Sequence, residues 1–174
     1  MDPYIAFQPV VTGKLTVRLL EADDSDALFE CYHDRSAVRL MNDDNCDFGF
    51  YVDTPEHMAE TVGYWLDFYA KRYFIRFSVV DNATGKAVGT LEGFVDETAV
   101  FRLDICSDYE KAEYLTGLLC FARDNFREYF GNEYLMTKAV PEARERRKAL
   151  EDGGWEYVGE YRGFGDYYRT KTVG

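Results

Sequence analysis

A turn between a predicted strand and a predicted helix carries the residues of greatest chemical interest. It reads Ser107-Asp108-Tyr109-Glu110-Lys111-Ala112-Glu113-Tyr114-Leu115. The first amides of a helix lack partners and lie at the positive end of its dipole, so such a turn can bind an anion. Ser107 and Glu110 have the spacing of a capping box, which predicts a helix that begins at residue 108 or 109 with its amides capped. Alternatively, Glu110 and Glu113 are only favourable acidic residues in a first turn.

A basic cluster follows later in the chain and could also meet an anion. It consists of Arg144, Arg146, Arg147 and Lys148. These residues could hold phosphate groups. They could equally form a solvated helix face that is balanced by nearby glutamates, and we favour this second interpretation.

Metal and covalent chemistry are not expected. His33 and His57 are too few and too far apart in the sequence for a zinc site. The segment Asp43-x-Asn45-x-Asp47 resembles the start of a calcium loop, but the later glycine and glutamate are misplaced. The four cysteines form no Cys-x-x-Cys pair and are expected to be free thiols.

Predicted elements place these residues in one mixed α/β sheet with helices on both faces. About seven strands are predicted, over residues 15–20, 74–80, 87–94, 99–105, 134–140, 155–161 and 167–172. Helices are predicted after the cap residues 23–26, over 55–71, from the turn to about residue 130, and from Pro141 to Gly153. Because a helix joins the strands at Ala99 and Tyr134, these two strands should be parallel.

Composition limits both the domain organisation and the partners. The 174 residues suit a single domain, 1–174, and 17% aromatic residues predict a large aromatic core or a cavity lined by rings. A formal net charge of −12 repels nucleic acid and favours cationic ligands such as amines. With no signal peptide and no apolar run long enough to span a membrane, the chain is expected to be cytoplasmic, without a membrane partner.

The order of elements resembles that of the GNAT N-acetyltransferases over nearly the whole chain. The segments that carry the likeness most specifically are Leu15–Leu20, the turn Asp81–Lys86 with the strand after it, and the helix end Leu150–Trp155. They are similar to the branch that acetylates the N-termini of ribosomal proteins and related amines. The resemblance implies a single GNAT-like domain in which the parallel pair at the centre of the sheet splays apart.

The resemblance also implies acetyl-CoA as the cofactor. In the family, the pantetheine arm pairs with strand edges in the splay, and a glycine-containing turn presents its amides to the pyrophosphate. The corresponding cofactor-binding residues here are Leu103, Ile105, Lys111, Ala112, Tyr114, Leu115 and Thr116.

Several departures put that cofactor in doubt. The turn has Glu110 where the family has a basic or amide residue, Glu113 for its first glycine, and Leu115 for a small residue. Two carboxylates therefore occupy the positions that would contact the pyrophosphate of acetyl-CoA. The tyrosine that protonates the leaving thiolate in many members is replaced by Leu150, so the usual general acid is missing.

Two strand carboxylates remain as catalytic candidates. By strand parity, Glu92 and Asp104 could face the splay and deprotonate an amine, directly or through water. Alternatively, Asp104 pairs with Arg102 on the same face, and Glu92 is a solvent-facing carboxylate.

Two functions follow from the sequence. The first is an acetyl-CoA-dependent N-acetyltransferase that acts on a small-molecule or peptide amine by direct transfer. The second is a degenerate, non-catalytic protein of the same fold that binds another ligand or a protein partner. A homodimer is a further possibility, and it is compatible with either function.

Overall fold

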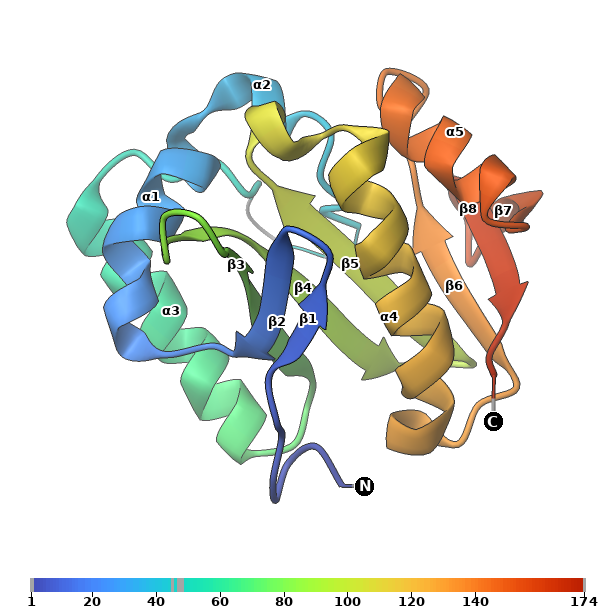
Figure 1. Cartoon of the computed structure of the whole chain (residues 1–174), viewed down its shortest axis with the longest axis horizontal. Helices are drawn as coiled ribbons and strands as arrows, with labels where there is room; N and C mark the ends of the chain where they lie inside the picture. Colours follow the sequence, from blue (N-terminus) through green and yellow to red (C-terminus); the bar gives the residue numbers. More distant parts are fainter. Residues whose placement is uncertain (1, 45, 47–48, 174) are drawn as a thin grey trace.

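The structure, a computed structural model, describes residues 2–44, 46 and 49–173. Its centre is an eight-stranded sheet in the order β1-β2-β3-β4-β5-β6-β8-β7 (Figure 1). The strands are β1 Val10–Thr12, β2 Leu15–Leu19, β3 Ile75–Asp81, β4 Ala87–Val95, β5 Ala99–Ile105, β6 Tyr134–Lys138, β7 Glu156–Tyr161 and β8 Phe164–Lys171. All seven predicted strands are present, and β1 is added because a three-residue strand is too short to show alternation.

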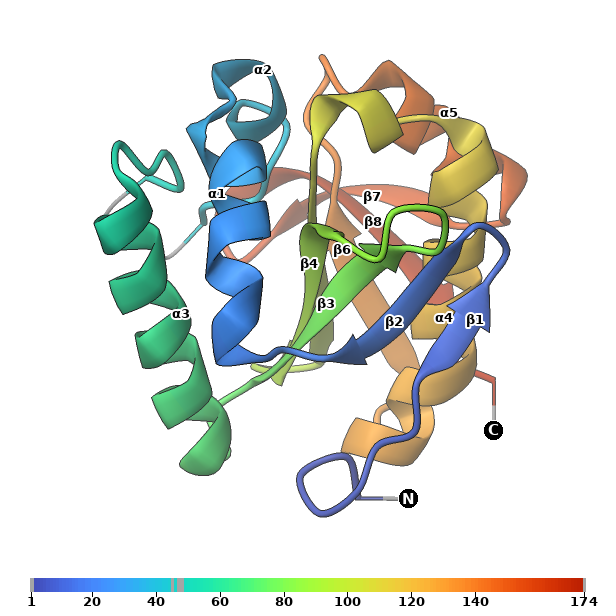
Figure 2. The same cartoon turned by 60° about the vertical axis from the view of Figure 1, so that its left-hand side comes forward.

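The helices lie on both faces of this sheet (Figure 2). They are α1 Ser25–His33, α2 Arg35–Val38, α3 Pro55–Ala70, α4 Ala112–Phe130 and α5 Arg144–Asp152. Short 3-10 turns at Ala22–Asp24 and Ser107–Tyr109 precede α1 and α4. On one face, α4 packs over the middle of the sheet, whereas α1 and α3 cover the opposite face.

Local sequence signals explain most helix ends. The Thr54 hydroxyl accepts a hydrogen bond from the His57 amide at the start of α3, as the Thr-Pro pair predicts. Gly131, with φ of 74°, ends α4 in the left-handed conformation that favours glycine. The last helix begins at Arg144 and not at Pro141, because Pro141 lies in a turn that the Ala143 amide closes on the Val140 carbonyl.

Two hydrophobic cores sandwich the sheet. The larger one joins the odd-numbered side chains of β3 and β5, with Val88 and Leu91 of β4, to the buried stripe of α4. Gly93 in β4 lets α4 approach closely, since a Cβ there would lie 2.7 Å from a ring carbon of Phe126. The second core packs α1, α2 and α3 against each other. In the described part of the chain, no helix is long and apolar enough to cross a membrane.

Candidate functional site

The central parallel pair splays apart, as the resemblance implies. Strands β5 and β6 pair only at Ala99 with Leu135 and at Val100 with Met136. Beyond that point the Thr137 hydroxyl still reaches the Phe101 carbonyl, at 2.9 Å. The following carbonyl on this edge of β5, that of Leu103, therefore has no partner from β6.

Arg146 of α5 fills the space between the two strands. Its guanidinium donates from Nη1 to the Leu103 carbonyl at 2.8 Å and, more weakly, to the Leu40 carbonyl at 3.3 Å. Its Nε and Nη2 donate to the two carboxylate oxygens of Glu110, at 2.8 and 2.7 Å. Only 2% of Arg146 and 9% of Glu110 are exposed. The guanidinium thus occupies the edge of β5 where the resemblance places the pantetheine arm.

The spacing of residues in α5 could have predicted that Arg146 is buried. The three other basic residues around it instead suggest a solvent-exposed helix face. Arg146 shares its helix face with Ala149 and Leu150, three and four residues further on, and all three are buried. A charged residue on the apolar face of a helix needs a buried partner of opposite sign, and Glu110 supplies it. The solvated interpretation suits other members of the cluster, since Lys148 pairs with Asp152 on the surface.

The predicted capping box is wrong. Residues 107–109 form a separate 3-10 turn, and α4 begins only at Ala112. The Ser107 hydroxyl donates to Asp34 at 2.7 Å, and Glu110 turns inward to Arg146. Both side chains are therefore engaged elsewhere, because the buried guanidinium is a stronger partner for Glu110 than a solvent-facing amide.

The start of α4 has backbone amide donors that its own residues do not cap. The amides of Ala112 and Glu113 have no partner within the described part of the chain. The Glu113 carboxylate points away to Lys14, at 2.5 Å, in an exposed pair. Lys111 is the N-cap residue and provides no side-chain cap.

The other predicted cofactor residues are mostly engaged in packing. Leu103, Ile105 and Leu115 belong to the main core. The ring of Tyr114 packs at a tilt against that of Tyr109, with ring centroids 4.9 Å apart. The Thr116 hydroxyl bonds to the Ala112 carbonyl of its own helix, 2.9 Å away. Their role in binding a cofactor stays a prediction.

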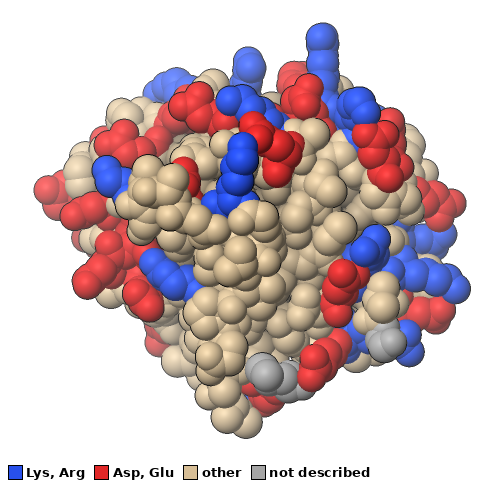
Figure 3. Space-filling view, in the orientation of Figure 1, with Lys and Arg blue, Asp and Glu red and all other residues tan. Residues whose placement is uncertain are grey.

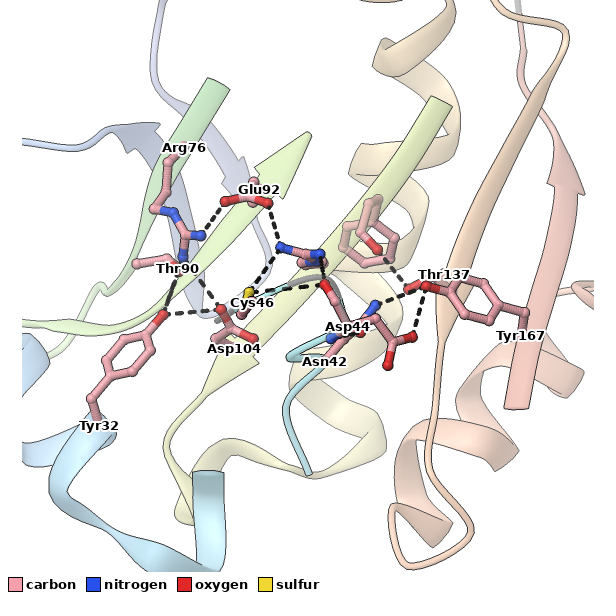
Figure 4. A network of polar contacts seen from close by, with 12 residues as sticks. Tyr32, Asn42, Asp44, Cys46, Arg76, Thr90, Glu92, Asp104, Thr137 and Tyr167 are labelled. Atoms are coloured by element: carbon pink, nitrogen blue, oxygen red, sulfur yellow. Dashed lines mark hydrogen bonds and ion pairs between the residues drawn. The ribbon is translucent and has the colours of Figure 1, made fainter. Parts of the chain in front are cut away.

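The predicted catalytic carboxylates, Glu92 and Asp104, lie on the face of the sheet toward Tyr32 of α1 (Figure 4). Glu92 is 3% exposed, so it is not a solvent-facing carboxylate. It pairs with Arg76 and, at 3.1 Å, with Arg102. Asp104 is fully buried and pairs with Arg76 at 3.3 Å, not with Arg102. A general-base role for either residue stays a prediction.

Asp104 has an unusual environment for a carboxylate. Its Oδ2 accepts from the Tyr32 hydroxyl at 3.0 Å, and its Oδ1 has no partner among the described residues. Burial raises the pKa of the Asp104 carboxyl, although the Arg76 guanidinium opposes this shift. The Arg76 guanidinium also stacks on Trp65, 3.9 Å from the ring centroid. These contacts tie α1, α3 and three strands together.

A second part of this network lies beside β6 and β8. The Asp44 carboxylate binds the Lys138 ammonium at 2.5 Å and the Tyr167 hydroxyl at 3.1 Å. Arg102 donates to the Asp44 carbonyl at 2.5 Å, so Asp44 is held against the sheet. Burial raises the pKa of Tyr167 to about 12. Asn45 and Asp47 of the predicted loop lie outside the described residues.

A groove lies beside the turn that follows β5 and the start of β4. Its volume is about 470 Å³, and it separates the start of α1 from the β3–β4 turn. Its lining includes four acidic residues and one basic residue, Lys86; the acidic residues are Asp23, Asp24, Asp26 and Glu30. The groove is therefore mainly acidic.

Solved acetyltransferases share this arrangement of elements. Ribosomal-protein-S5-alanine acetyltransferase from Vibrio fischeri aligns with a TM-score of 0.71 and 15% identity, over 96% of this chain and 97% of that one. A GNAT-family acetyltransferase from Bacillus anthracis aligns with 0.71 and 16%, over 95% and 98%. Spermidine N-acetyltransferase from Vibrio cholerae, solved with CoA and spermine, aligns with 0.63 and 18%, over 91% and 92%. No family model and no curated protein matches the sequence. The chain has the GNAT fold.

Proposed function

We propose that this protein is a non-acetylating protein of the GNAT fold that binds an amine-bearing or basic partner. The observation that carries the proposal is the buried Arg146–Glu110 pair between β5 and β6. The guanidinium and carboxylate of this pair fill the space between β5 and β6 in which the resemblance places the pantetheine arm of acyl-CoA. Acetyl-CoA chemistry is then absent because the cofactor has no open edge of β5 to bind.

Displacing Arg146 would be costly for an incoming cofactor. Moving the guanidinium leaves Glu110 buried without a countercharge, and breaking such a pair costs about 3–5 kcal/mol. At 1.4 kcal/mol for each factor of ten, that penalty weakens binding roughly 100- to 4,000-fold.

Charge supports a basic partner. The net charge is −12, and the 470 Å³ groove beside α1 is lined by four acidic residues and one lysine. The spermidine N-acetyltransferase of the same fold was solved with spermine bound, and the S5-alanine acetyltransferase acts on a ribosomal protein. The fold therefore accommodates both small amines and protein substrates. We infer that the partner binds in the acidic groove and not in the space between β5 and β6.

A second function, acetyl-CoA-dependent N-acetylation of an amine, is favoured by one observation. The amides of Ala112 and Glu113, unpartnered within the described residues, could meet a pyrophosphate at the positive end of α4. For this function Arg146 would have to leave the splay when the cofactor enters.

Calorimetric titration with CoA separates the two functions. We expect no heat of binding from the wild type at millimolar CoA, and micromolar binding by the wild type would support the transferase. The variant Glu110→Gln/Arg146→Ser opens the splay and should gain affinity, whereas the surface variant Lys148→Ser should behave as the wild type.

The basic partner has a separate test. Spermine, used as a probe for linear cations, should raise the melting temperature of the wild type. Asp23→Asn/Asp26→Asn should lose most of that shift, and Glu160→Gln on β7 should retain it. An equal shift in all three proteins would show only non-specific charge attraction and would contradict the proposed groove.

A further inference from the structure

Two cysteines meet where α1 packs on the end of β5. All four cysteines are free thiols. Cys31 on α1 is completely buried in the second core, and Cys106, the residue after β5, packs against the same core. Burial raises the pKa of the Cys31 thiol, and the Cys106 thiol beside it raises that pKa further. The two side chains are therefore neighbours in the fold, although their residues are distant in the sequence.

The surrounding chain holds these two cysteines together. Ala27 lines the acidic groove together with Cys106, and Cys31 lies one helical turn after Ala27 on the same face of α1. Ser107, the next residue after Cys106, donates from its hydroxyl to the Asp34 carboxylate at 2.7 Å. Asp34 directly follows α1. These contacts hold Cys106 against the face of α1 that carries Cys31.

Only one of the two thiols is accessible from outside. Cys106 is partly exposed and lines the acidic groove, whereas Cys31 has no exposed surface. The groove is lined by four acidic residues and one lysine, and Figure 3 shows Asp and Glu side chains gathered over the side of the molecule where Figure 1 places α1. A positively charged reagent should therefore reach Cys106 more readily than a negatively charged one.

We propose that Cys31 and Cys106 form a modification site, at which a small cationic disulfide converts the two thiols to an intramolecular disulfide. The Cys106 thiolate attacks one sulfur of the reagent, which releases a first small thiol and leaves a mixed disulfide on Cys106. Cys31 then attacks the Cys106 sulfur and releases the second small thiol. The two protein thiols are oxidised, the reagent is reduced, and the protons of the protein thiols end on the two released thiols.

The disulfide would connect two parts of the groove lining. One part is α1, which carries Asp26 and Glu30, and the other is the turn after β5, which carries Tyr109. Its formation would therefore hold these two parts of the groove together. The reaction requires access to Cys106 and no bound amine, so it is independent of the function proposed above.

Cystamine, a disulfide with two ammonium groups, tests the proposal on the full chain. The folded wild type is treated near about pH 8, the remaining thiols are blocked, and peptide mass spectrometry should then find Cys31 linked to Cys106. In Cys31→Ala the second step is impossible, so Cys106 should keep a cysteamine adduct. This variant leaves a small apolar side chain in the core, and its circular dichroism spectrum checks the fold. The matched control Cys120→Ser should form the same Cys31–Cys106 link as the wild type.

Glutathione disulfide, which is negatively charged, provides a second comparison. The link should form about tenfold more slowly with it than with cystamine, and Asp23→Asn/Asp26→Asn should bring the two rates closer together. A wild type in which Cys106 keeps its adduct while Cys31 stays free overturns the proposal. So does a Cys106 that stays unmodified while Cys120 reacts. A rate ratio that is the same in the Asp23/Asp26 variant also contradicts it, because the reagent would then not enter through the groove.

Discussion

Replacing Arg146 with methionine should be among the most damaging substitutions of a charged residue in this protein. The side chain makes four hydrogen bonds at 2.7–3.3 Å while only 2% exposed, and Arg146→Met leaves Glu110 buried without its partner. The expected loss is about 3–5 kcal/mol in the free energy of unfolding. For a chain of this length, that corresponds to a fall in Tm of roughly 6–20 °C.

The double variant Glu110→Met/Arg146→Met makes the test sharper. Exchanging both partners for apolar residues removes the unpaired charge, so the double variant should be at least about 2 kcal/mol more stable than Arg146→Met alone. Urea unfolding at pH 7 measures all three proteins, with Lys148→Met as a surface control that should stay within about 0.5 kcal/mol of the wild type. Additive losses, or a loss below about 1 kcal/mol for Arg146→Met, would refute the buried pair.

Three further predictions concern the elements that hold the site. Burial alone would raise the pKa of Asp24, but hydrogen bonds from Arg18 and Ser78 hold that pKa below its usual range. The stabilisation is therefore complete above about pH 4 and is lost as pH falls through the lower folded pKa, so Asp24→Asn should cost about 1–3 kcal/mol at pH 7 and flatten the acid limb of a stability–pH curve. Thr54→Ala removes the cap of α3 and should cost about 1 kcal/mol in urea unfolding, against no change for the exposed Thr116→Ala. Gly93→Ala forces a methyl group against Phe126 and should lower stability by about 1–3 kcal/mol, and an unchanged Tm would contradict the close packing of α4.

Local patterns in the sequence predict most of the fold correctly. Alternation identifies the longer strands, Thr54-Pro55 marks the start of α3, and Gly131 marks the end of α4. The patterns miss β1, which is three residues long, and they start the last helix too early at Pro141. Proline suits a first helical turn but also suits a plain turn, and neighbouring residues alone do not decide between them.

The candidate site is less predictable because its contacts join residues that are distant in sequence. Glu110 has the spacing of a capping residue, and only the approach of Arg146, 36 residues later, turns it inward. Glu92 and Asp104 alternate correctly along their strands, but parity gives no information on Arg76 from a third strand. Local spacing therefore predicts that the Glu92 and Asp104 carboxylates lie on one face of the sheet. Which arginines they pair with depends on tertiary packing.

The side-chain Nε–H resonance of Arg146 gives the most direct test that the chain fills its own splay. In a ¹⁵N-resolved NMR spectrum of the wild type, we predict a sharp, slowly exchanging Arg146 Nε–H signal, because that proton is buried against Glu110. Millimolar CoA should leave this signal and the amide signals of residues 103–116 unchanged. Rapid solvent exchange of the Arg146 Nε–H proton, or saturable shifts of these amide signals on adding CoA, would contradict the claim that Arg146 fills the space between β5 and β6.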